Sequence, residues 1–320
     1  MSRYAAVHAN PQGLGDGRPT AMQIVKDESM EGKLAGKTVV ITGVSSGIGI
    51  ETVRALSATG ARLLLTARDL AKAKSALDGI FDPSTMDLIQ MDQSSLSSVT
   101  ILVTNAAIMA VQDLQLTEDG HELQFATNHL SHFLLFNLLK PALLAGSSSN
   151  FQSRVVVVAA AAHRVAKLSP SDNYHFQKSG YNPWGAYGQS KLGNIYMANE
   201  IDRRYGSRGL HAISLHPGLI ATGLVQNLPK EELGAMMQNE AMLKMQKSLE
   251  QGAATTLWAA VSKELEGKGG LYLSDCAVAP NGQDDGIPFL GTTSSSTYNS
   301  EDEARLWKDS LEMVGLSGDE

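Results

Sequence analysis

The chain has 320 residues, of which 43% are hydrophobic and 18% charged, and this composition excludes a disordered or fibrous protein. Its formal net charge of −7 and pI near 5.6 leave no basic footprint for nucleic acid or an anionic membrane, so neither is expected as a partner. A single cysteine, Cys276, excludes an intramolecular disulfide and favours a reducing, cytoplasmic setting.

The N-terminal residues 1–35 are rich in glycine, proline and polar side chains and lack the apolar core of a signal peptide. We expect them to form a flexible arm. The longest apolar stretch, residues 133–145, has the length of a core helix and contains Lys140, so no membrane span is expected. Residues 36–320 then form one domain, because the polar stretches within them are too short to be domain linkers.

Short apolar runs rich in β-branched residues alternate with longer helical patterns. Continuous rather than alternating apolar strands indicate burial on both faces, as in a parallel sheet covered by helices. The alternation therefore predicts a doubly wound, Rossmann-like fold of three α/β/α layers. The predicted strands are Thr38–Thr42, Arg62–Thr66, Asp87–Met91, Ile101–Thr104, Arg154–Val158, His211–Leu215 and Gly270–Leu273.

The first predicted strand runs directly into a glycine-rich turn with the spacing G-x3-G-x-G, and a helical pattern follows. Such a tight turn needs residues without a Cβ, so that backbone N–H groups at the helix start can approach a pyrophosphate. A glycine turn alone is equally well explained as a structural loop, but its place between a buried strand and a helix favours dinucleotide binding. The candidate cofactor residues here are Gly43, Ser46, Gly47, Ile48 and Gly49.

The end of the second predicted strand carries Arg68, about 20 positions after the glycine turn. An acidic residue there would bind a ribose 2′-hydroxyl, whereas an arginine accommodates a 2′-phosphate. Asp69 follows directly and complicates this pattern, and the alternative for Arg68 is a solvated surface charge. We interpret the position as favouring NADP over NAD.

Tyr187 and Lys191 lie four residues apart behind Asn182-Pro183, a typical helix start, so they share one helix face. A tyrosine with a pKa near 10 is a poor acid or base at neutral pH. A neighbouring ammonium favours the phenolate and is expected to lower the pKa of Tyr187 towards neutrality. The Y-x3-K pattern also occurs by chance in many helices.

The motifs together, in this order, resemble the short-chain dehydrogenase/reductase family, over most of residues 36–320. Its retinol-dehydrogenase-like and fungal branch is the most similar, on the stretches 127–130, 162–163 and 251–273. The resemblance implies hydride transfer between NADP(H) and a carbonyl or alcohol. The motifs that carry it are the TGxxxGxG turn, Asn105-Ala106, Tyr187 with Lys191, and Pro217-Gly218 ending at Thr222.

The resemblance also implies roles for individual residues. Tyr187 matches the general acid/base, Lys191 the residue that binds the nicotinamide ribose and tunes the tyrosine, and Asn128 the asparagine that holds a proton-relay water. The other matched positions contact the cofactor: Ile48 and its glycines at the pyrophosphate, Asn105 beside the turn, Asp92 at the adenine, and Ile220 and Thr222 at the carboxamide. No metal is implied.

One departure from the family pattern concerns the substrate oxygen. The family places a serine after its fifth strand, and alignment on Ala162-His163 puts Ala160 at that position, with apolar neighbours on both sides. Loss of one donor to a developing oxyanion costs about 10²–10³ in rate. We therefore predict an impaired redox enzyme, and expect His163 to be structural.

A second departure is an abnormally short crossover between the third and fourth strands, where the family has a helix. Asp92 and Ile101 are nine residues apart, a separation that extended chain covers in at most about 30 Å. Crossing three strand spacings over a packed face and returning along a strand needs about 40 Å. A shifted third strand or a path around the sheet edge would disturb Asp92, so reduced NADPH affinity is expected.

The segment between Thr222 and Gln251, where the family has its substrate lid, contains Met236, Met237, Met242 and Met245. Methionines give an adaptable apolar lining, although ordinary helix packing explains them equally well. The prediction is an NADP(H)-dependent oxidoreductase that acts on an apolar small molecule, such as a secondary metabolite. The alternative is a non-redox or inactive descendant that uses the fold as a binding or cyclisation pocket. By resemblance, a homodimer through the helices beside the fourth and fifth strands is expected.

Overall fold

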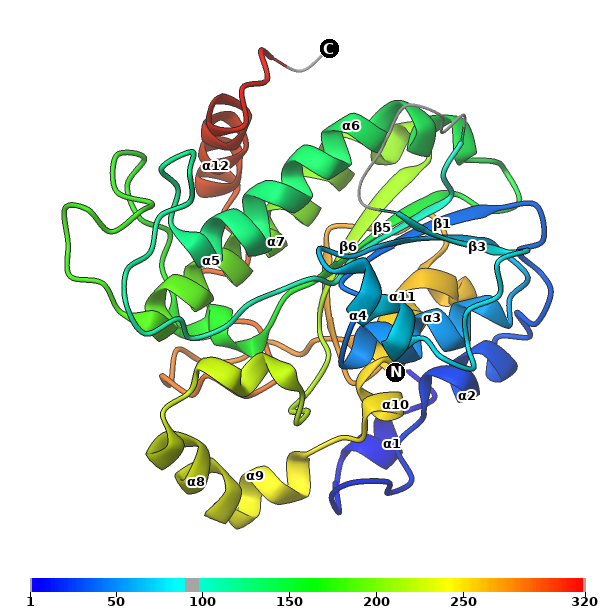
Figure 1. Ribbon diagram of the computed structural model, residues 1–320, viewed down its shortest axis with the longest axis horizontal. Helices are drawn as coiled ribbons and strands as arrows, with labels where there is room; N and C mark the ends of the chain where they lie inside the picture. The colour runs from blue at the N-terminus through cyan, green and yellow to red at the C-terminus, as the bar shows by residue number, and fades with distance from the viewer. Residues whose placement is uncertain (1, 90–97, 319–320) are drawn as a thin grey trace.

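The computed structural model describes residues 2–89 and 98–318, and its centre is an eight-stranded sheet (Figure 1). The strand order is β3-β2-β1-β4-β5-β6-β7-β8, with every pair parallel except β7 and β8. The strands are β1 Thr38–Thr42, β2 Arg62–Thr66, β3 Met86–Ile89, β4 Ile101–Thr104, β5 Ser153–Val158, β6 Leu210–His216, β7 Leu271–Ser274 and β8 Ala277–Val278.

Strand positions follow the apolar runs closely. The predicted bounds of β1, β2 and β4 are confirmed to the residue. Those of β5 differ by one residue at one end, those of β6 and β7 by one residue at each end, and β3 begins one residue earlier than predicted. The short β8, which the sequence analysis missed, pairs with β7 across a tight turn in which Asp275 and Cys276 have φ near +54° and +53°. Every residue of β5 and β6 is buried, as a sheet covered on both faces requires.

Helices cover both faces of the sheet and confirm the three-layer, doubly wound α/β fold. Alternate strand residues pack into two different clusters, with Val39 and Ile41 in one and Val40 in the other. The helices on the first face are α2 Ala21–Asp27, α3 Ile48–Ser57, α4 Leu70–Ala76 and α11 Ala254–Val261, and those on the second are α6 Ser131–Gly146, α7 Pro183–Tyr205 and α12 Ser300–Met313.

The N-terminal segment differs from the expected flexible arm, because it packs on the domain. It contains α1 Ala5–His8 and α2, and Thr20 caps α2 by accepting a hydrogen bond from the backbone N–H of Gln23. Ile24 and Val25 are fully buried against α3 and α11. The apolar face of α2 supplies the physical reason, since its exposure would leave both side chains in water.

The link between β3 and β4 consists of residues 90–100, and β2 and β1 lie between the two strands in the sheet. Most of this link, including Asp92, lies outside the described residues. The expected disturbance of the adenine pocket therefore stays a prediction.

The C-terminal helix α12 packs on α7, and Trp307 contacts the rings of Phe133 and Phe136 on α6. The helices through which a family homodimer is expected to form are therefore partly covered by the chain's own C-terminus (Figure 1). A dimer through this face would have to accommodate α12.

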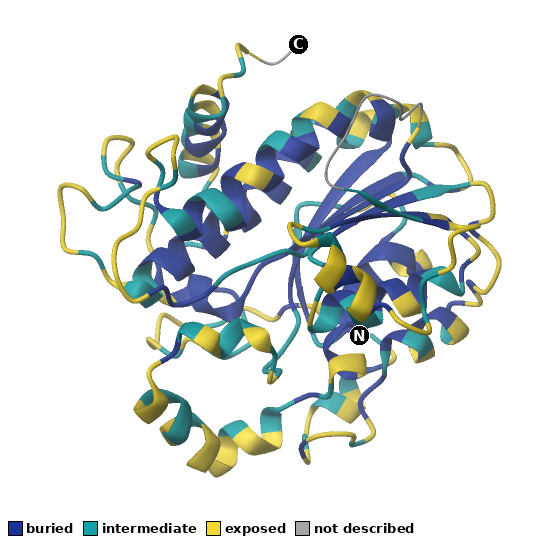
Figure 2. Cartoon of the chain, viewed as in Figure 1, coloured by how far each residue is buried: buried dark blue, intermediate teal, exposed yellow. Residues whose placement is uncertain are grey.

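The segment after β6 projects beyond the C-terminal edge of the sheet. It contains a short helix, Gly223–Asn227, followed by α8 Lys230–Gln238 and α9 Glu240–Met245, and we call residues 223–246 the lid. Neither α8 nor α9 has a buried residue, and Figure 2 shows the lid as largely exposed. Across residues 2–89 and 98–318, no helix has the length and apolar character needed to span a bilayer.

Candidate active site

A cavity of about 2320 Å³ extends along the C-terminal edge of the sheet, from the glycine turn to the lid. It exceeds the roughly 300–1,000 Å³ of an ordinary small-molecule site, so a dinucleotide and a substrate can share it. Two predicted site residues, Asn128 and Gly49, are not among the residues that line it. The predicted site residues that line it are Gly43, Ser46, Gly47, Ile48, Arg68, Asn105, Tyr187, Lys191, Ile220 and Thr222.

The glycine turn depends on the absence of side chains at its glycines. Gly43 has φ +72°, and a Cβ there would lie 2.6 Å from the Cα of Ala106. A Cβ on Gly49 would lie 2.2 Å from the Gly43 carbonyl oxygen. Gly47, with φ +65°, directly precedes α3. The turn is thus packed backbone against backbone at the N-terminus of a helix, the arrangement that suits a pyrophosphate.

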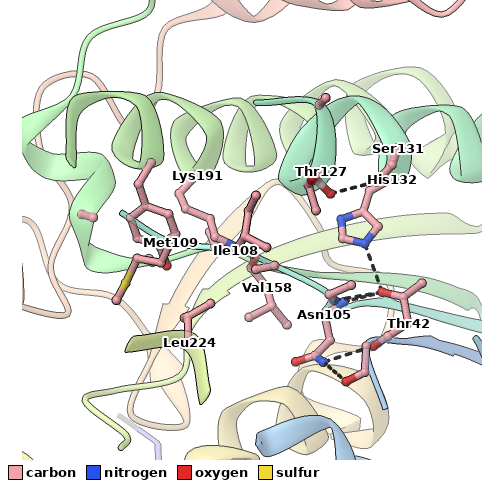
Figure 3. A pocket seen from close by; sticks show the side chains of 18 of the residues that line it. Thr42, Asn105, Ile108, Met109, Thr127, Ser131, His132, Val158, Lys191 and Leu224 are labelled. Atoms are coloured by element: carbon pink, nitrogen blue, oxygen red, sulfur yellow. Dashed lines mark hydrogen bonds between the residues drawn. The ribbon is translucent and has the colours of Figure 1, made fainter. Parts of the chain in front are cut away.

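A hydrogen-bonded group behind this turn joins three elements, and Asn105 is its one member that the sequence motifs indicate. The Asn105 side-chain amide donates to the carbonyls of Thr42 and Gly43, both at 3.1 Å. The Thr42 hydroxyl accepts the backbone N–H groups of Asn105 and Ala106, so its own proton points to Nε2 of His132 at 3.0 Å (Figure 3). Burial lowers the pKa of His132 to about 4, which keeps this imidazole neutral.

Arg68 and Asp69 both line the cavity at the end of β2. The Asp69 carboxylate caps α4 by accepting the backbone N–H of Lys72 at 2.9 Å. Arg68 is exposed on the cavity wall, where Lys72 also lies. This end of the cavity thus has two cations, Arg68 and Lys72, and one carboxylate, Asp69, which also caps α4.

Tyr187 and Lys191 lie side by side on α7, which begins as predicted. Asn182 caps it by accepting the Gly185 N–H at 2.7 Å, and Pro183 takes the first helical position. The exposed fractions of Tyr187 and Lys191 are 4% and 2%. The Lys191 ammonium nitrogen lies 5.8 Å from the centre of the tyrosine ring and donates to the Val158 carbonyl at 2.9 Å.

The prediction that the Lys191 ammonium lowers the pKa of Tyr187 does not agree with the structure. Burial raises the pKa of Tyr187 above its ordinary value of 10, and burial lowers the pKa of Lys191 to about 7. The hydrogen-bond partner of the ammonium is an uncharged carbonyl, so burial favours the neutral form of both groups. Tyr187 therefore holds its proton.

Asn128 is buried in a π-helical turn, Ala126–Leu130, at the start of α6. Its side-chain oxygen accepts the Ile108 N–H, and its amide donates to the Ile108 carbonyl and to the Ser190 hydroxyl, all at 2.9 Å. Its backbone carbonyl accepts from Nδ1 of His132 at 3.0 Å. The side chain thus joins the loop after β4 to α7 behind the cavity wall.

The wall beside Tyr187 is apolar. Ala160 is 8% exposed and packs in one cluster with Met109, Ala162 and Tyr187. Ala159 and Ala161 also line the cavity, so this stretch offers no hydroxyl to a substrate oxygen. The absence of the family's serine therefore has a direct structural consequence.

Two buried histidines support this alanine stretch. Nδ1 of His216 accepts the Ala161 N–H at 3.2 Å, and burial lowers the pKa of His216 to about 3. Nε2 of His216 therefore has the imidazole proton. His163 contacts the Ala160 carbonyl at 2.8 Å and the Thr297 hydroxyl at 2.9 Å, a structural arrangement as expected.

The lid closes the other side of the cavity. Its methionines divide: Met236 and Met242 line the cavity, whereas Met237 is 61% exposed. Trp184 at the start of α7 lines the cavity too and donates to Glu232 on α8 at 2.7 Å. An apolar substrate would meet methionine and aromatic surface here.

Comparison with known proteins agrees with this geometry. The family model described as short chain dehydrogenase matches residues 37–233. The chain belongs to the short-chain dehydrogenase/reductase family. It is 42% identical to oxidoreductase calI of Penicillium decumbens, over the whole chain and 99% of that relative, and 43% identical to short-chain dehydrogenase/reductase prx1 of Penicillium roqueforti, over 98% and 96%.

A solved structure of an uncharacterised protein from Mycobacterium paratuberculosis is similar as well, with a TM-score of 0.67 and 28% identity over 93% of this chain and 98% of that one. The alignment to calI extends over 345 positions against 320 residues here, and calI therefore has residues that this chain lacks. The family and its fungal relatives were thus identified correctly from the motifs. The chain is an oxidoreductase of a family that uses a nicotinamide dinucleotide.

Proposed function

We propose that this short-chain dehydrogenase/reductase uses NADP(H) to interconvert a carbonyl and an alcohol on an apolar small molecule. The observation that supports this most is the buried pair of Tyr187 and Lys191, which lines the same cavity as the glycine turn. A phenol, an amine and a pyrophosphate cradle in one cavity are the protein groups that this chemistry needs.

The residues present fit the dinucleotide. The steric requirement for glycine at Gly43 and Gly49 leaves the start of α3 open to phosphate oxygens, and Ile48 lies at that start. Arg68 would pair with a 2′-phosphate, while Asn105 holds the turn and Ile220 and Thr222 border the nicotinamide end. When bound, NADP(H) supplies or accepts the hydride.

The protein groups then handle the proton. Tyr187 keeps its proton because burial raises its pKa, so the phenol is in the form that donates to a carbonyl oxygen when the substrate is reduced. Lys191 binds ribose hydroxyls and, when protonated, stabilises the phenolate that remains. Asn128 holds the adjacent backbone for a proton-relay water. Ala160 leaves Tyr187 as the donor to the substrate oxygen, so turnover is slow.

The proposed substrate is an apolar carbonyl compound of secondary-metabolite type. Support comes from the alanine wall, from Met236 and Met242 on the lid, and from Trp184 and Phe289, which line the same cavity. The single, buried Cys276 favours a cytoplasmic setting as part of the same proposal.

The test is NADPH oxidation by the purified protein against a panel of apolar aldehydes and ketones, with Tyr187→Phe as control. Turnover in the wild type that falls by about 10²–10⁴ in Tyr187→Phe, without change in NADPH affinity, is the expected result. NADPH binding with no turnover, in the wild type and in Ala160→Ser, would instead identify a non-redox descendant of the family. Equal use of NADH would contradict the role given to Arg68.

A further inference from the structure

Residues Gly13–Arg18 of the N-terminal segment lie against the C-terminal end of the lid. The Arg18 guanidinium donates to the carbonyls of Met245 at 3.0 Å and Gln246 at 2.5 Å, which follow each other at the end of α9. It also donates to the Gly13 carbonyl at 3.0 Å. Arg18 is 5% exposed, so these are bonds of a buried cation, which are stronger than those of a solvated one.

The charge of this buried guanidinium has its own counter-ion. Nε of Arg18 donates to the Asp16 carboxylate at 2.8 Å. Burial by itself raises the pKa of Asp16, but the hydrogen bonds from Arg18 and from the Gln12 backbone outweigh it and lower the pKa to about 2. The pair is thus charged at all ordinary pH values, and the arginine is free to orient two lid carbonyls without an unbalanced charge.

A second contact between the same two segments has its donor side chain, Gln251, on the lid side. Gln251, just beyond the lid, donates to the backbone carbonyls of Asp16 at 3.0 Å and Arg18 at 3.1 Å, and it accepts the Gly15 N–H at 3.2 Å. The two segments are more than 230 residues apart in sequence. Their polar groups are therefore matched in both directions, as in a built interface.

This interface continues into the active-site wall. Gln246 pairs with Leu219, and the backbone N–H of Lys247 donates to the Leu219 carbonyl at 2.8 Å. The Lys247 ammonium reaches the Pro217 carbonyl at 3.3 Å. Leu219 and the neighbouring Ile220 line the cavity, so a shift at residues 245–247 is transmitted directly to the wall.

The lid helices α8 and α9 have no fully buried residue, and the apolar anchors of the lid, the buried Leu228 and the partly buried Met236, lie before α9. At the first end, Asn227 donates to the Met109 carbonyl at 3.0 Å, and Glu232 accepts from Trp184. At the second end, the two carbonyls that precede the Leu219 contact accept from Arg18. Because α9 has no buried residue, the hydrogen bonds at this second end contribute most to its position.

We propose that Arg18 is a positioning residue for the reaction, which holds the lid closed over the substrate and fixes the Pro217–Ile220 loop. The N-terminal segment is then part of the substrate site, although none of its residues lines the described cavity. The kinetic consequence rests on the proposed function, whereas the effect on the lid does not.

The kinetic test compares Arg18→Met and Arg18→Lys with Arg54→Met, which removes an arginine of α3 that pairs with Glu51. Arg18→Met is expected to raise KM for the carbonyl substrate about tenfold, the loss of roughly one charge-assisted bond, while kcat stays within about threefold. Arg18→Lys keeps the charge but loses the two-pronged guanidinium that donates to both carbonyls. Its KM should lie between those of the wild type and Arg18→Met. If Arg18 had a purely structural role, part of the Arg18→Met protein would be unfolded. That would lower the apparent kcat and leave KM unchanged.

A second test measures how accessible the lid is to a protease and needs no turnover. Trypsin cleavage after the exposed Lys244 on α9 should be about tenfold faster in Arg18→Met than in Arg54→Met, and slower again when NADPH is added. Asp16→Asn weakens the ion pair with Arg18 but keeps the arginine. It should therefore raise KM and the cleavage rate by less than Arg18→Met does. Equal cleavage rates and equal KM values in Arg18→Met and Arg54→Met would overturn the proposal. Faster cleavage with no turnover in any variant would retain it and reject the proposed function.

Discussion

The two ends of the cavity are built in opposite ways. At the cofactor end, the turn after β1 is packed against backbone at Gly43 and Gly49, and α3 buries residues over its whole length. At the substrate end, the wall is alanine and the lid helices α8 and α9 have no fully buried residue. The cofactor end is thus determined by close packing that tolerates no added atom, while the substrate end has space to change. Substitutions at the two ends should therefore have opposite consequences.

The largest expected effect is a gain at the substrate end. Ala160→Ser should raise kcat/KM for carbonyl reduction by about 10²-fold, because it adds one hydroxyl donor to the wall beside Tyr187. Steady-state NADPH oxidation measures it. Ala162→Ser, on the same wall, is the matched control and should gain little. If both variants gain equally, general polarity rather than a positioned donor limits the enzyme.

At the cofactor end, a single methyl group should cause a loss. Gly49→Ala puts a Cβ 2.2 Å from the Gly43 carbonyl oxygen, so the turn must open, and NADPH affinity should fall by about 10²-fold. Gly234→Ala in α8 meets no atom within 4 Å and should leave the affinity unchanged. Fluorescence titration of NADPH separates the two, and unchanged affinity in Gly49→Ala would show that the turn is not a close-packed cradle.

The electrostatic part of the cofactor end is more tolerant, because Arg68 is exposed. Arg68→Ala should weaken NADPH about tenfold and NADH by much less, since only NADPH has a 2′-phosphate. Arg62→Ala, an exposed arginine of β2 that pairs with Asp87, is the control. Parallel titrations with both nucleotides give the ratio, and an equal loss for the two would remove Arg68 from the phosphate site.

The smallest expected effect is on stability. Because burial lowers the pKa of Lys191 to about 7 from 10.5, folding must neutralise or bury this amine, a cost that is complete below pH 7 and disappears as pH rises towards 10.5. Lys191→Met should therefore raise Tm by about 2–6 °C at pH 6 and by little at pH 10, while it abolishes turnover. Thermal denaturation at the two pH values measures this, with the exposed Lys268→Met as control. A lower Tm at pH 6 would contradict the buried, unbalanced amine.

Sequence reasoning worked best where backbone geometry and burial leave few alternatives. The strands β1, β2 and β4 were placed to the residue because continuous apolar runs have one solution in a doubly wound sheet. The steric need for glycine at Gly43 and Gly47 was predictable because positive φ and close approach exclude other residues, while their role in cofactor binding stays a prediction. The prediction that Ala160 stands at the family's serine position needed only an alignment on Ala162-His163.

Sequence reasoning failed where the packing, protonation or hydrogen bonding of a residue depends on partners far along the chain. The apolar residues of α2 were hidden in a Gly- and Pro-rich segment, so the segment was expected to be an arm. The pKa of Tyr187 was expected to fall, because spacing shows a neighbouring amine but not the burial of both groups. His132 and Thr42 were missed because their bond joins residues 90 positions apart.

The amino-acid order alone determined the layers of the sheet, the glycine turn and the helical pairing of Tyr187 with Lys191, since all three follow from local periodicity and local sterics. Tertiary structure alone decided the burial that sets the protonation of that pair and the contact between Arg18 and the lid. These depend on desolvation and on hydrogen bonds between distant segments, which no spacing along the chain encodes.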